Sequence, residues 1–153
     1  MTEHVVTLLE QVDRRAEWCP ISQALDVVGN RSAFLLMREA YYGTTRFEDL
    51  VSRSGFSEAV VAARLKDLVD EGLMERRPYQ EPGMRTRHEY HLTESGGDFF
   101  PVLAAMASWS SRWRGPSPIR FQHRDCGARV RVGLQCEHGH DIDADDIELV
   151  RTK

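Results

Sequence analysis

The sequence predicts a mainly α-helical α+β protein in which a two-stranded β-hairpin interrupts a series of amphipathic helices. Apolar residues recur at helical spacing before residue 73 and again from residue 93 to 113. Between these regions, residues 73–93 form two short segments around a Pro-Gly pair, which is typical of a hairpin. The 153 residues fit one domain with a small extension. We therefore expect a main domain over residues 1–114 and a C-terminal appendage over residues 115–153.

Short helices are expected in the first part of the chain. Residues 3–17 carry Val6, Leu9 and Val12 at spacings of three, which predicts an amphipathic helix. Three further stretches with helical periodicity end at or just before a glycine, which is a common helix terminator. These stretches are residues 20–28, 31–43 and 44–55.

Residues 57–71 predict the next helix, with Ser57 as its N-cap. Val61, Leu65 and Leu68 recur at i, i+4 and i+7, so this face is expected to enter the core. A face of small side chains remains on the other side, where a helix backbone can approach the floor of a DNA major groove. The residues expected on this exposed face are Ala59, Ala62, Ala63 and Lys66, with Arg64 near its boundary.

The hairpin has strands within residues 73–80 and 87–93, joined through Pro82 and Gly83. Thr93 is the expected N-cap of one long helix that runs to about residue 113. Short helices that close on a two-stranded hairpin are the elements of a winged helix-turn-helix, a DNA-binding fold. The apolar stripe of the long helix comprises Phe99, Val102, Leu103, Met106, Trp109 and Trp113.

Charge is unevenly distributed along this acidic chain, whose formal net charge is −4. Residues 76–87 contain four arginines and one acid, whereas residues 141–150 contain five acids and no base. A local basic field of this kind is where a polyanion docks. No apolar run long enough to span a membrane and no secretory signal are found, and three cysteines fit a reducing compartment, so we expect a cytoplasmic protein. No nucleophile–base arrangement or phosphate-binding glycine loop indicates an enzyme.

Four stretches, in order and at matching spacing, resemble the HxlR-type winged-helix transcriptional regulators. They are "CPISQALDVVGNR" (19–31), "LLMREAYYGTTRFEDL" (35–50), "SEAVVAARLKDLVDEGLMERR" (57–77) and "RHEYHLTESG" (87–96). The resemblance implies a recognition helix over residues 57–71, a wing over residues 73–92 and a homodimer built from the first and last helices. Members usually carry tryptophan where this chain has Ser32, and polar residues where it has the three alanines of the recognition helix. Specificity is therefore expected to rest on thymine methyl groups and DNA shape.

The resulting hypothesis is a dimeric repressor that binds an inverted repeat in double-stranded DNA and responds to an oxidant or small molecule. The alternative is a winged-helix module that binds another protein without specific DNA recognition. Expected DNA contacts are Ser57, Ala59, Ala62, Ala63, Arg64, Lys66, Arg76, Arg77, Arg85 and Arg87. The expected dimer interface comprises Val6, Leu9, Val12, Phe99, Val102, Leu103, Met106, Trp109 and Trp113.

Two cysteine-containing regions leave alternatives open. Several family members sense oxidants through a cysteine at the place of Cys19, so a sensor role stands beside that of an unreactive, half-buried cysteine. In the tail, the alternatives are a zinc site, a metal-free hairpin and a disulfide between its two cysteines. We favour the metal-free hairpin, and with it no cofactor, because the spacing lacks a second thiolate in each knuckle. The candidate ligands are His123, Cys126, Cys136, His138 and His140.

Overall fold

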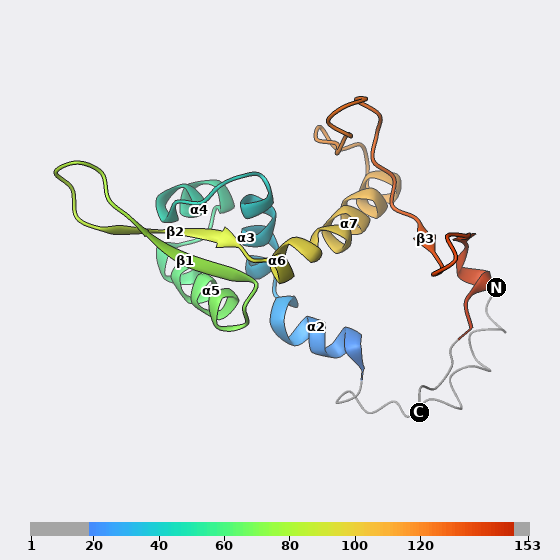
Figure 1. Cartoon of the computed structure of the whole chain (residues 1–153), viewed down its shortest axis with the longest axis horizontal. Helices are drawn as coiled ribbons and strands as arrows, with labels where there is room; N and C mark the ends of the chain where they lie inside the picture. The colour runs from blue at the N-terminus through green and yellow to red at the C-terminus, as the bar shows by residue number, and fades with distance from the viewer. Residues whose placement is uncertain (1–18, 149–153) are drawn as a thin grey trace.

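The structure is a computed structural model that describes residues 19–148 of the chain (Figure 1). The helix expected over residues 3–17, with Val6, Leu9 and Val12, lies outside the described residues. Within residues 19–148, no helix combines the length and the hydropathy that a membrane crossing requires.

Between residue 19 and the hairpin there are four helices, and their bounds follow the predicted ones closely: α2 Pro20–Val28, α3 Arg31–Tyr41, α4 Phe47–Ser54 and α5 Glu58–Asp70. Side-chain caps fix two of the starts. Asn30 accepts a hydrogen bond from the Ala33 N–H at 2.7 Å, and Ser57 accepts one from the Val60 N–H at 3.4 Å. These caps satisfy backbone donors that the first turn of a helix leaves without partners.

The core forms around α3, which contacts α4, α5 and the hairpin. Leu36 and Met37 of α3 are fully buried, since they lie beneath α4 and α5. Each neighbouring element contributes apolar side chains to the same cluster. The principal contributors are Leu50 from α4, Val61, Leu65 and Leu68 from α5, and Leu73 and Met74 at the start of the hairpin.

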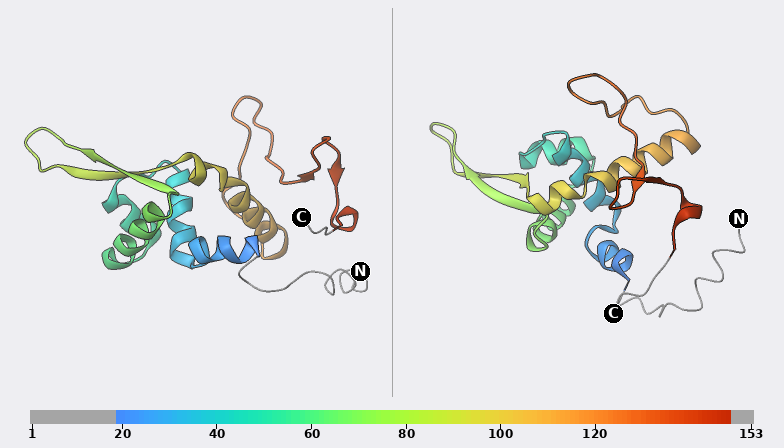
Figure 2. Two further views of the ribbon diagram at one scale, coloured as in Figure 1. Left: turned by 60° about the horizontal axis from the view of Figure 1, so that its bottom comes forward. Right: turned by 45° about the vertical axis from the view of Figure 1, so that its right-hand side comes forward.

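The hairpin pairs β1 Met74–Tyr79 with β2 Arg87–Leu92 in antiparallel register, with Met74 opposite Leu92 and Tyr79 opposite Arg87. Its base is anchored by the buried Met74, whereas the connecting loop over residues 80–86 is exposed. The hairpin projects beyond α4 and α5 as a wing, and the tail lies toward the opposite end of the molecule (Figures 1 and 2).

The structure corrects the prediction of one long helix after the wing, because two helices are present: α6 Glu94–Asp98 and α7 Phe100–Trp113. Thr93 is the predicted N-cap and accepts a hydrogen bond from the Gly96 N–H at 3.1 Å. The break follows from Pro101, which has no N–H to donate to the preceding turn. At the junction the Phe99 N–H instead bonds Gly96 O at 3.3 Å. The Phe99 ring packs on Phe34, with ring centroids 5.4 Å apart.

The appendage contains two small turn units where a single hairpin was expected. The first is closed by an isolated bridge between Gln122 and Arg129. The second pairs β3 Leu134–Gln135 with β4 Asp141–Ile142 and is followed by the 3-10 turn η2 Ala144–Asp146. The tail is attached to the main domain through Phe121, whose ring packs edge-on against Phe100 at 5.1 Å between centroids.

Candidate nucleic-acid interface

The helix-turn-helix is formed by α4, a short turn and α5. Gly55 ends α4 in the left-handed conformation, with φ of 73°, and its N–H bonds Val51 O at 3.2 Å. Glycine adopts this conformation without the steric penalty that a Cβ would bring. Ser57 then begins α5, so the sequence fixes both ends of the turn locally.

Helix α5 has the two faces that its sequence predicts. Val61, Leu65 and Leu68 are at most 1% exposed and hold the helix on the core. Arg64 lies at the boundary and is half-buried. The outward face therefore presents small side chains together with one ion pair: Ser57, Ala59, Ala62, Ala63 and Lys66 are exposed, as is Asp70, the partner of Lys66.

Both cations of α5 are paired with acids on the same helix. Arg64 Nη1 lies 2.6 Å from Asp67 Oδ2, and the Lys66 amine contacts the Asp70 carboxylate. The hydrogen bond to Asp70, and then its charge, raise the pKa of Lys66 above its ordinary value. Water screens ion pairs that are exposed in this way, so each pair is weak, and both cations of α5 keep a carboxylate beside them.

Three of the four predicted wing arginines also have polar partners. Arg76 Nη2 lies 2.8 Å from His88 Nδ1, and Arg87 Nη1 lies 3.2 Å from Glu48 Oε1. Arg77 contacts Glu75 on the same strand. Within residues 19–148, the Arg85 side chain has no hydrogen-bond or ion-pair partner, so it is the wing guanidinium most available to a phosphate.

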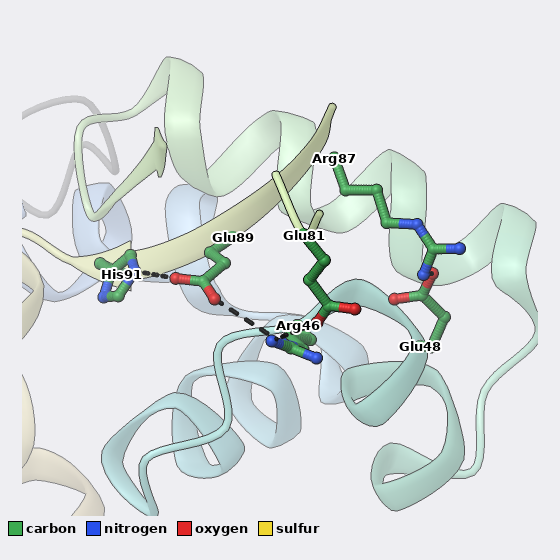
Figure 3. A network of polar contacts seen from close by, with 6 residues as sticks. All are labelled: Arg46, Glu48, Glu81, Arg87, Glu89 and His91. Carbon is green, nitrogen blue, oxygen red and sulfur yellow. Dashed lines mark hydrogen bonds and ion pairs between the residues drawn. The ribbon is translucent and has the colours of Figure 1, made fainter. Parts of the chain in front are cut away.

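Sequence reasoning missed Arg46, which connects the wing to the helix-turn-helix (Figure 3). Its guanidinium lies 2.9 Å from Glu81 and 3.8 Å from Glu89, and it stacks over the Tyr79 ring at 4.9 Å from the centroid. The backbone supports the same junction, since the Tyr90 N–H bonds Thr45 O at 2.8 Å. No local sequence signal could reveal these contacts, because the partners of Arg46 lie more than thirty residues further along the chain.

The recognition helix and the wing meet at a shared hollow of about 380 Å³. Ala62, Lys66 and Asp70 border it from α5, and Arg76 and Tyr90 border it from the wing. Two of the predicted cations, Lys66 and Arg76, are thus brought to one place beside the small face of α5. A duplex with a recognition helix in its major groove meets both elements at once.

The predicted dimer residues of the last helices divide into two groups. Phe99 and Leu103 pack against the core of the same chain. The other four form an exposed apolar stripe along α7, with exposed fractions between 44% and 64%: Val102, Met106, Trp109 and Trp113. Cys19 is the half-buried N-cap of α2, and its thiol makes no capping hydrogen bond.

The tail holds two separate Cys–His pairs. His123 Nδ1 lies 3.3 Å from Cys126 Sγ, and His140 Nδ1 lies 3.5 Å from Cys136 Sγ. Backbone N–H groups of His140 and His138 lower the pKa of Cys136 below its ordinary value. Over the described part of the chain, no three His, Cys, Asp or Glu side chains are gathered around a point where a metal ion could bind.

Comparison with known proteins agrees with this geometry. A family model for the HxlR-like helix-turn-helix matches residues 27–118. The HTH-type transcriptional regulator Rv3095 of Mycobacterium tuberculosis is 34% identical over 144 residues, which cover 91% of this chain and 89% of the relative. The crystal structure of PA1607, a proposed transcription factor, has a TM-score of 0.78 at 31% identity and covers 88% of this chain and 96% of that one. The oxidised form of the redox regulator HypR has a TM-score of 0.56 at 25% identity, covering 61% of this chain and 96% of its own.

These matches include the helix-turn-helix, the wing and α7, and the family they identify is one of transcriptional regulators, which is not an enzyme class. The chain belongs to the HxlR-like helix-turn-helix family and is a DNA-binding transcriptional regulator.

Proposed function

We propose that the protein is a homodimeric repressor that binds an inverted repeat, with α5 in the major groove and the wing on the phosphate backbone. The observation that carries this proposal is the exposed small face of α5 beside the hollow that Lys66 and Arg76 share. Alanine side chains let the helix backbone lie close to base edges and contact thymine methyl groups. The resemblance to this family supports repression and a role without catalysis, and a cytoplasmic location remains part of the proposal.

The affinity for DNA is expected to come mainly from phosphate contacts, since the base-reading donors on α5 are few. Each phosphate that a cation neutralises contributes about −0.9 to the slope of log K against log salt concentration. Arg85→Ala should therefore lower affinity for every sequence and flatten this slope. Arg114→Ala is the matched control, because Arg114 is also an exposed arginine but lies at the end of α7.

The test is site selection from randomised duplexes with the purified protein, followed by gel shift across a range of salt concentrations. Enrichment of an inverted repeat, with half-sites about one helical turn or a multiple apart, supports the proposal. No enrichment and no salt dependence would favour the alternative of a module that binds protein.

The dimer is proposed to form through the exposed stripe of α7. Apolar side chains exposed to this degree on one helix face are typical of an interaction site. In sedimentation experiments we expect a dimer at micromolar concentration and a monomer for the Trp109→Ser, Trp113→Ser double variant. Met84→Ser is the control, since Met84 is a comparably exposed apolar residue in the wing loop. A wild-type monomer that binds one half-site at full affinity would contradict this part of the proposal.

Regulation is proposed to act through oxidation of Cys19. Two observations support it: Cys19 is a half-buried N-cap of α2 whose thiol makes no capping hydrogen bond, and the chain is similar to HypR, a redox regulator. Oxidation of the thiol at this position would alter the start of α2, which packs on α3 of the core.

A further inference from the structure

A second hollow, far from the wing, lies between α3, α7 and the beginning of the tail. It has a volume of about 210 Å³. Its α7 wall is made by small and hydroxyl side chains, among them Ser108 and Ser111. At about 100° of rotation per residue, Ser111 falls on the side of α7 opposite the exposed apolar stripe, and Ser108 falls beside it.

Positive charge gathers in this hollow. Arg38 reaches it from α3, and Arg120 and Arg129 reach it from the tail, while no carboxylate lines it. Arg38 is already bonded to Glu39, with Nε 3.0 Å from Oε1. Arg120 and Arg129 have no hydrogen-bond or ion-pair partner for their side chains within residues 19–148. Two guanidinium groups thus border one cavity without a counter-ion from the described protein.

The remaining lining groups define the chemistry of a ligand. Tyr42 and the two serines offer hydroxyl groups that can bond an anionic oxygen, whereas Ile119 and Phe121 offer an apolar wall. Phe121 is held in place by its edge contact with Phe100. The volume is below the roughly 300–1,000 Å³ of sites for drug-sized molecules, so the occupant must be small.

We propose that this cavity binds a small organic carboxylate, whose charged end is held by Arg120 and Arg129 and whose apolar end lies on Phe121. Guanidinium groups suit this role because their planar N–H donors match the two oxygens of a carboxylate. The site is separate from the DNA-binding surface, which lies at the wing end of the molecule (Figure 2). Occupancy of the cavity does not depend on whether the protein binds DNA.

Calorimetric titration of the full chain, without DNA, tests the proposal. The probes are benzoate and hexanoate, with benzamide as a neutral molecule of the same shape as benzoate. We expect saturable binding of at least one carboxylate and none of benzamide. The Arg120→Ala, Arg129→Ala double variant should weaken carboxylate binding at least tenfold. Because both side chains are exposed, the substitutions should leave the fold intact.

The matched control is the Arg114→Ala, Arg124→Ala double variant, which removes the same charge from exposed positions outside the cavity and should bind as wild type does. Ser108→Phe, which narrows the cavity from α7, should also abolish binding. The proposal is wrong if neither carboxylate binds at millimolar concentration, if benzamide binds equally well, or if both arginine double variants lose the same affinity.

Discussion

Gly96 lies at the point where α6 meets the backbone that leads into the wing, and the structure leaves no room there for a methyl group. A Cβ added to Gly96 would lie 2.0 Å from Leu73 O and 3.2 Å from Leu92 Cδ2. At Gly97, the next residue of the same helix, an added Cβ meets nothing within 4 Å. The two positions therefore form a matched pair, in which Gly→Ala should have opposite effects on stability.

The magnitude follows from what must move. Relief of the contact requires α6 or the Leu73 carbonyl to shift by about 1 Å, and overpacking of this kind costs about 1–3 kcal/mol. The same shift strains two hydrogen bonds, each worth about 1 kcal/mol: Thr93 N–H to Leu73 O at 3.1 Å, and the Tyr41 hydroxyl to Gly96 O. Against these costs, alanine favours the helical conformation by about 1 kcal/mol relative to glycine. We expect Gly96→Ala to lower the free energy of unfolding by about 3 kcal/mol, and Gly97→Ala to raise it by about 0.5–1 kcal/mol.

Urea denaturation followed by circular dichroism measures both values, and comparable slopes for the variants would show that the shift in midpoint reflects stability. The contact would be refuted if Gly96→Ala unfolded at the same urea concentration as Gly97→Ala. Loss of stability in both variants would also contradict the reasoning, because nothing obstructs a methyl group at Gly97.

Four further outcomes are expected. Burial, and then the charge of Asp98, raise the pKa of Tyr41 from 10.0 to about 12. The neutral tyrosine therefore contributes to the free energy of unfolding below pH 10, and this contribution is lost as the pH rises through 12. Urea titrations at alkaline pH should show this decline in the wild type and not in Tyr41→Phe. Arg64→Ala should cost about 1–3 kcal/mol of DNA binding and change base preference in competition gel shifts, and an unchanged preference would assign Arg64 to packing only. Cys19→Ser should bind DNA but fail to release it under diamide, whereas a variant without both tail cysteines should still respond; equal release from wild type and Cys19→Ser would exclude the sensor. Elemental analysis should find well under one zinc per chain, and a chelator should leave the melting temperature of the core unchanged. One zinc per chain that is lost in His123→Ala would show that the tail is a zinc site.

Features encoded by neighbouring residues were predictable from the sequence. Ser57 and Thr93 cap their helices as expected, because an N-cap needs only a side-chain oxygen within the first turn. The buried face of α5 was also predictable, because the spacing of Val61, Leu65 and Leu68 places three apolar side chains on one side of the helix, where they pack into a core. Family resemblance supplied the order in which these elements close on the wing.

Features that depend on distant contacts were not predictable. The join between Arg46 and the wing needs Glu81 and Glu89 to be folded beside α4, and the pair of Arg87 with Glu48 has the same requirement. The break at Phe99 had a local signal in Pro101, but the apolar stripe continues across it and concealed it. The spacing of apolar residues shows which side of a helix is apolar, but it does not show which of those residues pack in the core and which remain exposed. That is why Phe99 and Leu103 were grouped with residues of the exposed stripe.

The ion pairs of α5 and the wing suggest that different residues provide affinity for DNA and discrimination between sequences. On α5, Arg64 and Lys66 each have an acid one turn later, so these cations approach DNA with a carboxylate beside them. The negative charge of a DNA phosphate is repelled by those carboxylates, whereas a hydrogen-bond donor on a base edge is not. We therefore expect α5 to be poorly suited to tight phosphate contact. The wing is different, because Arg85 has no acid partner within the described residues and lies in an exposed loop. We therefore expect affinity to depend mainly on the wing. We expect discrimination to depend on how closely the alanine face of α5 fits the groove, with the Arg46 contacts holding the wing against α4.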